Sequence, residues 1–135
     1  MKLVVDTPLL EGVTVLVTPL VERACHNLRH VVASDLPQDA RIEEVARESW
    51  GYAAAGWEMT ALVARVIGGD GTEIERRRIV VYQILWLVGT VMVSGSATAL
   101  ETHADDIEHM ARSARPHLWS DRPSCVDECF RMEDA

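Results

Sequence analysis

The dominant feature of the hydrophobic pattern is an uncharged segment that covers residues 79–100. A helix that is hydrophobic on all sides is either a membrane span or the buried centre of a helical bundle. Small and polar residues dilute the second half of this segment, which favours burial in protein over contact with lipid. We therefore predict a central apolar helix over about 73–94, opened by a capping box that Thr72 and Glu75 form.

Three more segments show the periodicity of amphipathic helices. Apolar residues recur at three- and four-residue spacing over 19–33 and over 40–67, so each of these helices has one face that needs a partner. A fourth helix is expected from Thr98 to Arg115, ahead of a proline. Its apolar stripe, at the spacing of a helix packed on another helix, consists of Leu100, His103, Ile107, Met110 and Ala114.

The first 18 residues allow two interpretations. The runs MKLVV and VTVLVT are rich in β-branched residues and flank a segment with Pro and Gly, which predicts a short N-terminal β-hairpin. Alternatively, Thr7 and Pro8 open a helix. We favour the hairpin. The predicted fold is mainly α: an antiparallel bundle of about four helices, forming a single helical domain over 1–116 with a C-terminal tail over 117–135.

Composition constrains the partners and the compartment. The formal net charge of −8 opposes the phosphate backbone of nucleic acid, so direct nucleic-acid binding is not expected. The three cysteines cannot all pair within one chain, and the first residues lack the pattern of a signal peptide. These features predict a cytoplasmic protein with reduced thiols.

The central helix also suggests self-association. Three amphipathic segments of one small chain do not enclose its whole surface, and a second copy would complete the cover. Small residues would let two such helices cross closely, so a homo-oligomer is expected; the other interpretation is that they mark a bend inside a monomer. The residues concerned are Gly89, Ser94, Gly95 and Ala97.

A second interaction surface is predicted on the fourth helix. Glu101, Asp105, Asp106 and Glu108 lie within eight residues, with no basic residue before Arg112. Such a face is either simply solvated or complementary to a basic surface on a protein partner. We expect a protein partner to bind these four carboxylates.

Several histidines and cysteines stand at spacings that metal sites use. Three sets deserve comparison: His26 with His30; His103 with Asp106 and His109; His117 with Cys125 and Cys129. Each set lacks the further ligands that would complete a site, and surface, core or small hydrophobic roles explain the same residues. We therefore predict no metal, no other cofactor and no catalytic residue.

These patterns predict a non-enzymatic helical protein that acts through protein–protein interaction or assembly, as an inhibitor, adaptor or scaffold. A small phage or accessory protein would fit the size and the charge. Two alternatives remain. The first is a single-pass membrane protein with its span at 79–100, preceded by three arginines. The second is a metal-dependent helical-bundle enzyme that uses the residues of 103–109.

Overall fold

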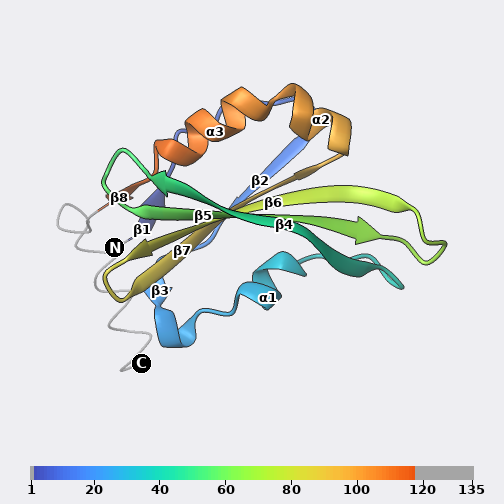
Figure 1. Cartoon of the computed structure of the whole chain (residues 1–135), viewed down its shortest axis with the longest axis horizontal. Helices are drawn as coiled ribbons and strands as arrows, with labels where there is room; N and C mark the ends of the chain where they lie inside the picture. The colour runs from blue at the N-terminus through green and yellow to red at the C-terminus, as the bar shows by residue number, and fades with distance from the viewer. Residues whose placement is uncertain (1, 118–135) are drawn as a thin grey trace, which may run out of the picture.

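The computed structural model describes residues 2–117 and is mainly β. Its centre is a six-stranded antiparallel sheet with the order β2-β7-β6-β5-β4, in which β3 also pairs with β7, and a two-stranded sheet pairs β1 with β8. The strands are β1 (Lys2–Val4), β2 (Val13–Val17), β3 (Val21–Glu22), β4 (Arg41–Tyr52), β5 (Glu58–Ile67), β6 (Glu73–Ile84), β7 (Leu87–Gly95) and β8 (Arg115–His117). The helices are η1 (Arg23–Cys25), α1 (Leu28–Val32), α2 (Ala97–Thr102) and α3 (Ala104–Arg112). Figure 1 shows α2 and α3 on one side of the sheet and α1 on the other.

The predicted central helix over 73–94 is wrong, because this segment forms β6 and β7 joined by a tight turn. Ile79 and Val80 point to opposite faces of β6, yet both are fully buried, because elements cover both faces of the sheet. A strand buried on both faces is a continuous apolar run, which periodicity cannot distinguish from a buried helix. The predicted membrane span over 79–100 is wrong for the same reason. Within residues 2–117, no helix is long and apolar enough to cross a membrane.

The predicted helix over 40–67 is wrong too, since the segment forms the β4–β5 hairpin. The GGDG sequence that follows is the turn of a second hairpin, between β5 and β6, in which Gly71 has a φ of +88°. An Asp-Gly pair between extended segments is a strong hairpin signal. Thr72 opens no helix: its hydroxyl donates to Asp70 Oδ1 over 2.7 Å inside the turn.

The first 33 residues combine extended and helical structure. β1 and β2 are strands, but they do not form the predicted hairpin, because β1 pairs with β8 and β2 pairs with β7. The helix predicted over 19–33 is reduced to α1, which follows β3 and η1. Asn27 caps α1, with its side chain accepting from the backbone N–H of His30 over 3.1 Å.

Helical structure does occur where a fourth helix was expected, as the pair α2 and α3. Ser96, rather than Thr98, is the N-cap, and it accepts from the backbone N–H of Ala99 over 3.0 Å. Most of the predicted apolar stripe is buried, but it packs on the sheet and not on another helix. The antiparallel helical bundle is therefore wrong as a fold, and the chain is an antiparallel sheet with short helices on its two faces.

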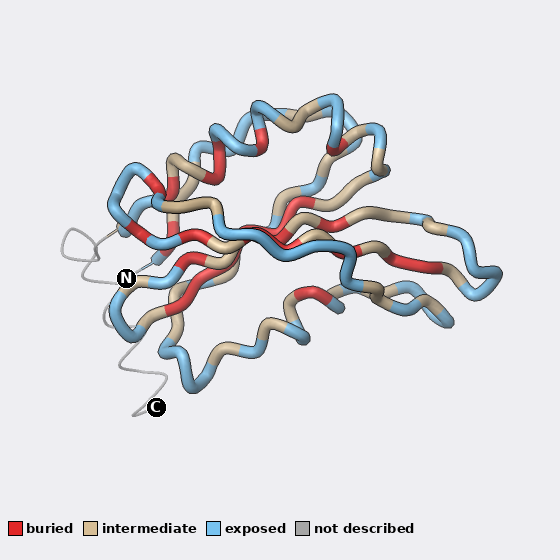
Figure 2. The backbone as a smooth tube through the Cα atoms, viewed as in Figure 1, coloured by how far each residue is buried: buried red, intermediate tan, exposed pale blue. Residues whose placement is uncertain are grey.

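The core has two unequal halves, one on each face of the sheet. The larger half lies under α2 and α3, where the Tyr82 hydroxyl donates to the carbonyl of Ala111 over 2.6 Å. The ring of Tyr82 also meets Trp57 edge-on, with 6.2 Å between the ring centroids. The smaller half, under α1, is built around Leu62 and Ile79. In Figure 2 the central strands are buried, whereas much of the α1 segment is exposed.

The two edges of the main sheet differ. One edge is formed by β2 and β3, which both pair with β7. The other is β4, whose pairing with β5 is irregular at two points, between Glu44 and Ala46 and between Ser49 and Gly51. Such bulges bend and twist an edge strand, so β4 is not a flat edge.

Candidate functional site

Three consecutive arginines of β6 point alternately to the two faces of the sheet. Side chains of a strand alternate between its faces, so Arg76 and Arg78 lie on the side of α2, and Arg77 lies on the side of α1. Arg77 is buried and donates to the carbonyls of Val32 and Ser34, at the end of α1, over 2.6 and 2.7 Å. Its role is structural, whereas the other two arginines line a cavity.

Arg65 of β5 stands directly opposite Arg76 in the register of the two strands. Two like charges in that position repel each other, and nearby carboxylates offset the repulsion. Glu73 lies 2.9 Å from Arg76 and 3.8 Å from Arg65. Arg65 donates a hydrogen bond to the carboxylate of Glu43 on β4, and this interaction raises the pKa of Arg65. These two guanidinium groups therefore have their charge balanced within the chain.

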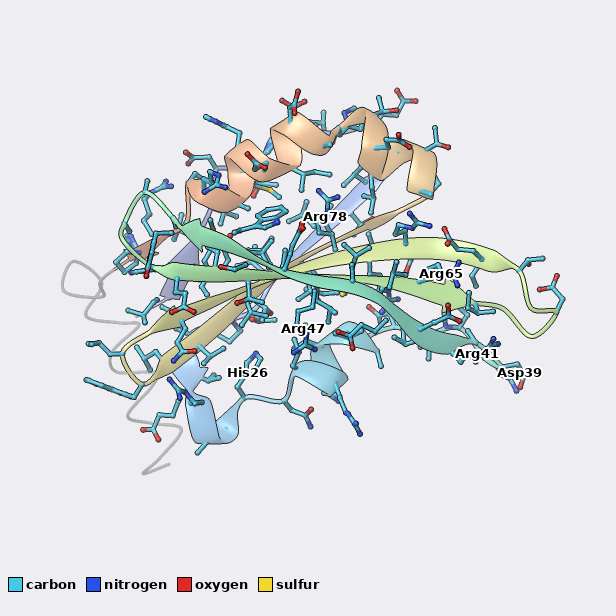
Figure 3. The ribbon with its side chains drawn as sticks, viewed as in Figure 1. His26, Asp39, Arg41, Arg47, Arg65 and Arg78 are labelled. Atoms are coloured by element: carbon cyan, nitrogen blue, oxygen red, sulfur yellow. The ribbon has the colours of Figure 1, made fainter. Side chains whose placement is uncertain are left out.

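Arg78 is different, because its half-buried guanidinium makes no ion pair or side-chain hydrogen bond with residues 2–117. Its Cζ atom lies 5.6 Å from the centre of the Trp50 ring, so the side chain reaches over β5 toward β4. Trp50 is itself oriented by a hydrogen bond from its Nε1 to Glu48, over 2.8 Å. Figure 3 shows Arg78 between the sheet and the α2–α3 layer.

The cavity beside Arg78 has a volume of about 330 Å³ and lies between the sheet and α2. We call it the arginine cleft. Its lining includes Val63, Arg76 and Arg78 from the sheet and Ala97, Leu100 and Glu101 from the helix. Glu101 is its one acidic lining residue, and no hydrogen bond or ion pair joins Glu101 to Arg78. A planar guanidinium with unused N–H groups in a cleft is suited to hold a carboxylate or a phosphate.

The predicted acidic face lies on α2 and α3. Glu101, Asp105, Asp106 and Glu108 are all exposed, and Glu108 pairs with Arg112 over 3.5 Å. Glu101 stands apart from the other three because it lines the arginine cleft. Binding of a protein partner to these carboxylates stays a prediction.

The small residues predicted to support self-association pack inside the chain. A Cβ added to Gly89 would lie 2.9 Å from Leu20, and one added to Gly95 would lie 2.5 Å from the carbonyl oxygen of Gly12. Ser94 pairs with strands on both sides, and Ala97 begins α2. The crossing of two apolar helices has no counterpart here, because these residues lie in β7 and at the start of α2. A homo-oligomer stays a prediction.

The metal-site candidates are dispersed. His26 follows η1 and His30 lies in α1, so their four-residue spacing does not fall on one helix. His103 joins α2 to α3, and Asp106 and His109 are exposed on α3. His117 ends β8, and both cysteines of its set lie outside the described residues. Across residues 2–117, no three His, Cys, Asp or Glu side chains group as metal ligands.

The arginine cleft was missed by sequence reasoning. In the helical interpretation, Arg76 and Arg78 flank an apolar segment and Arg65 lies on the polar face of a helix. The alternation of Arg76, Arg78, Val80 and Tyr82 would have placed the two arginines on one face once the segment was assigned as a strand. The contribution of Trp50 depends on strand register, for which the sequence gives no direct signal.

Comparisons with known proteins support the fold. No protein-family model matches the chain. No curated protein matches it either. A solved structure that is similar is the solution structure of cyanobacterial PsbP (CyanoP) from Synechocystis sp. PCC 6803, with a TM-score of 0.57 and 16% sequence identity. The match covers 78% of this chain and 68% of that chain.

This likeness corrects the predicted function along with the fold. The prediction of a small helical protein that serves as inhibitor, adaptor or scaffold depended on a helical bundle, and the chain is not helical. The single-pass membrane protein depended on a helix over 79–100, most of which forms strands. The metal-dependent enzyme depended on a helical bundle around residues 103–109; these residues are helical, but they pack on a sheet. At 16% identity the comparison shows the architecture alone: the chain has a PsbP-like fold.

Proposed function

We propose that this chain is a binding domain for a small oxyanion, a ligand with a carboxylate or phosphate group, which it holds in the arginine cleft. One observation carries the proposal. Arg78 is half-buried at the cleft, stacked on Trp50, and has no carboxylate partner among residues 2–117. A partly desolvated guanidinium without an anion is costly, and a bound oxyanion would offset that cost.

The chemistry of the cleft favours binding over catalysis. Among the residues that line it, Glu101 is the one group able to accept a proton, and no hydroxyl, thiol or imidazole accompanies it. The fork of Arg78 can form two parallel N–H···O bonds with a planar carboxylate or with two phosphate oxygens. Arg76 adds a second positive charge on the same face, already paired with Glu73.

Because the chain has a net charge of −8, its affinity for an anion must depend on contacts inside the cleft. The field of an acidic protein repels free anions at long range, but salt screens exposed charges beyond about 8 Å at physiological ionic strength. The affinity must therefore come from direct hydrogen bonds with the arginines. Inorganic phosphate serves as the probe for a phosphate ligand, and succinate serves as the probe for a carboxylate ligand.

The test is a titration of the folded chain with each of these anions, followed by amide chemical shifts in NMR spectra. We expect saturable shifts in Val63, Arg78 and Leu100 with at least one anion. Arg78→Gln should weaken that binding by about tenfold or more, the value of a hydrogen bond to a charged group. The matched control is Arg41→Gln, because Arg41 is exposed on β4 and lies outside the cleft. Equal affinity in the wild type and the Arg78→Gln variant would rule out the proposal.

A further inference from the structure

A second cavity lies on the opposite face of the sheet, between α1 and strands β4 and β5. Its volume is about 470 Å³, within the range of small-molecule sites. We call it the α1 groove. Its apolar lining includes Leu28 and Val32 from α1 and Ile42, Leu62 and Ala64 from the sheet.

The groove exists because this face is incompletely covered. α1 is the one α-helix among residues 2–117 that packs here, and it has five residues. Two small side chains leave the space open: Ala64 on the floor, which is fully buried, and Ala33 at the end of α1.

The position of α1 is fixed, so the groove is preformed. The buried Arg77 binds the carbonyls of Val32 and Ser34, and Asn27 caps the other end of the helix. A preformed cavity lowers the entropic cost of binding, because α1 need not be ordered by the ligand.

Two arginines stand at the groove from opposite sides. Arg29 comes from α1 and makes no ion pair with residues 2–117, while Arg47 comes from β4 and pairs with Glu44 at 3.0 Å. Figure 3 shows Arg47 on the α1 side of the sheet. With Glu44 as the single acid in the lining, the groove carries one uncompensated positive charge beside an apolar floor.

We infer that the α1 groove binds a single-chain aliphatic carboxylate, with its hydrocarbon chain over Leu62 and Ala64 and its carboxylate at Arg29 and Arg47. An apolar floor selects a hydrocarbon chain, and the excess positive charge selects an anionic head group over a neutral one. This site is independent of the arginine cleft, since the sheet separates the two.

The experiment measures dissociation constants of hexanoate, octanoate and decanoate, below their micelle concentrations, by calorimetry with the full chain. Octanol serves as the neutral probe. Burial of each added methylene should tighten binding by about fourfold, which corresponds to about 0.8 kcal/mol. Octanoate should bind more tightly than octanol, and a double Arg29→Gln, Arg47→Gln variant should abolish that preference.

A filling variant tests the location. Ala33→Phe places a large side chain in the groove from an exposed position, and should weaken decanoate binding by tenfold or more. Ala55→Phe, at an exposed position outside the lining, is the matched control. The inference fails if decanoate does not bind saturably, as expected if the groove instead receives a protein segment, or if Ala33→Phe and Ala55→Phe bind it equally. Arg78→Gln should leave decanoate binding unchanged; a loss there would assign the ligand to the arginine cleft.

Discussion

The guanidinium of Arg77 donates a hydrogen bond to the backbone carbonyl of Val32 over 2.6 Å and thereby ties the end of α1 to the central strand β6. Carbonyl groups in the last turn of a helix have no partner within the helix. A cation at that end also interacts favourably with the helix dipole. Arg77 supplies both interactions from a buried position, with Glu75 as its counter-ion at 2.6 Å.

The first prediction concerns this anchor. Arg77→Met should lower the free energy of unfolding by about 2–3 kcal/mol, because buried carbonyls and Glu75 lose a charged donor. Urea unfolding measures the loss. Relative to the wild type, amide hydrogen exchange in the variant should accelerate more in residues 28–34 than in β6. Arg41→Met, an exposed arginine, is the control and should stay within about 0.5 kcal/mol of the wild type. Unchanged exchange in α1 would contradict the anchoring role.

A second prediction concerns Tyr82, whose hydroxyl forms a buried polar link between the sheet and α3. Tyr82→Phe keeps the ring against Trp57 but leaves the carbonyl of Ala111 without its donor. The free energy of unfolding should fall by about 1–2 kcal/mol. Tyr52→Phe is the matched control, because Tyr52 is 67% exposed. Equal stability of the two variants would show that the hydrogen bond contributes nothing net.

The same tyrosine should produce a stability change at alkaline pH. Burial raises the pKa of Tyr82 above its ordinary value of 10.0. The unfolded chain therefore releases this proton at a lower pH than the folded chain, and the free energy of unfolding falls as the pH rises above about 10. The difference in stability between wild type and Tyr82→Phe should shrink between about pH 10 and 11. A constant difference over this range would show that folding does not raise the pKa of Tyr82.

His26 should lower the stability of the folded chain at acidic pH. Burial lowers the pKa of His26 from 6.5, and its Nε2 atom is buried without a hydrogen-bond partner within residues 2–117. Below pH 6.5 the unfolded chain binds this proton more readily than the folded chain, so stability falls as the pH drops. His26→Gln should reduce that loss between about pH 7 and 5, measured by urea unfolding. His30→Gln, at an exposed position, should leave it intact.

Glu101 should weaken anion binding in the arginine cleft. It is the acidic lining residue, and its charge opposes that of an incoming oxyanion. If the proposed function holds, Glu101→Gln should tighten binding of phosphate or succinate by a few-fold, with a smaller effect at high salt. Asp105→Gln, on the exposed side of α3, is the control for a general change of charge. Weaker binding by the Glu101→Gln variant would mean that this carboxylate helps to hold the ligand.

Of the helix predicted over 19–33, η1 and α1 are helical. The prediction is closest near the C-terminal end of the described chain, where α2 and α3 form. There, the spacing of Leu100, Ile107 and Met110 matches one buried face, and the segment has few β-branched residues. For 40–67, helical projection also produced a polar and an apolar face, although most of β4 is exposed. For 73–94 it produced a plausible helix because both faces of the sheet are covered there, which removes the alternation that identifies a strand. The β-branched residues of the latter segment pointed to strands: Ile74, Ile79, Val80, Val81, Ile84, Val88, Thr90, Val91 and Val93.

The turns between the strands were also difficult to predict from the sequence. The β6–β7 turn consists of Leu85 and Trp86, neither of which is a typical turn residue, and Leu85 adopts a φ of +52°. The pairing of Ile84 with Leu87 closes this two-residue turn, and the two turn residues themselves give no local signal of it. The arginine cleft and the α1 groove depended on the same missing information, because strand register decides which side chains share a face.

The irregular edge of the sheet has a consequence for strand pairing between molecules. A strand from another molecule that approached β4 would find its N–H and C=O groups out of step at two points. The opposite edge is made of β2 and β3, which have only five and two residues. Long regular edges promote open-ended stacking into fibres, and this architecture offers none within residues 2–117. Edge-to-edge pairing of folded chains through β4 would therefore lose hydrogen bonds at both bulges.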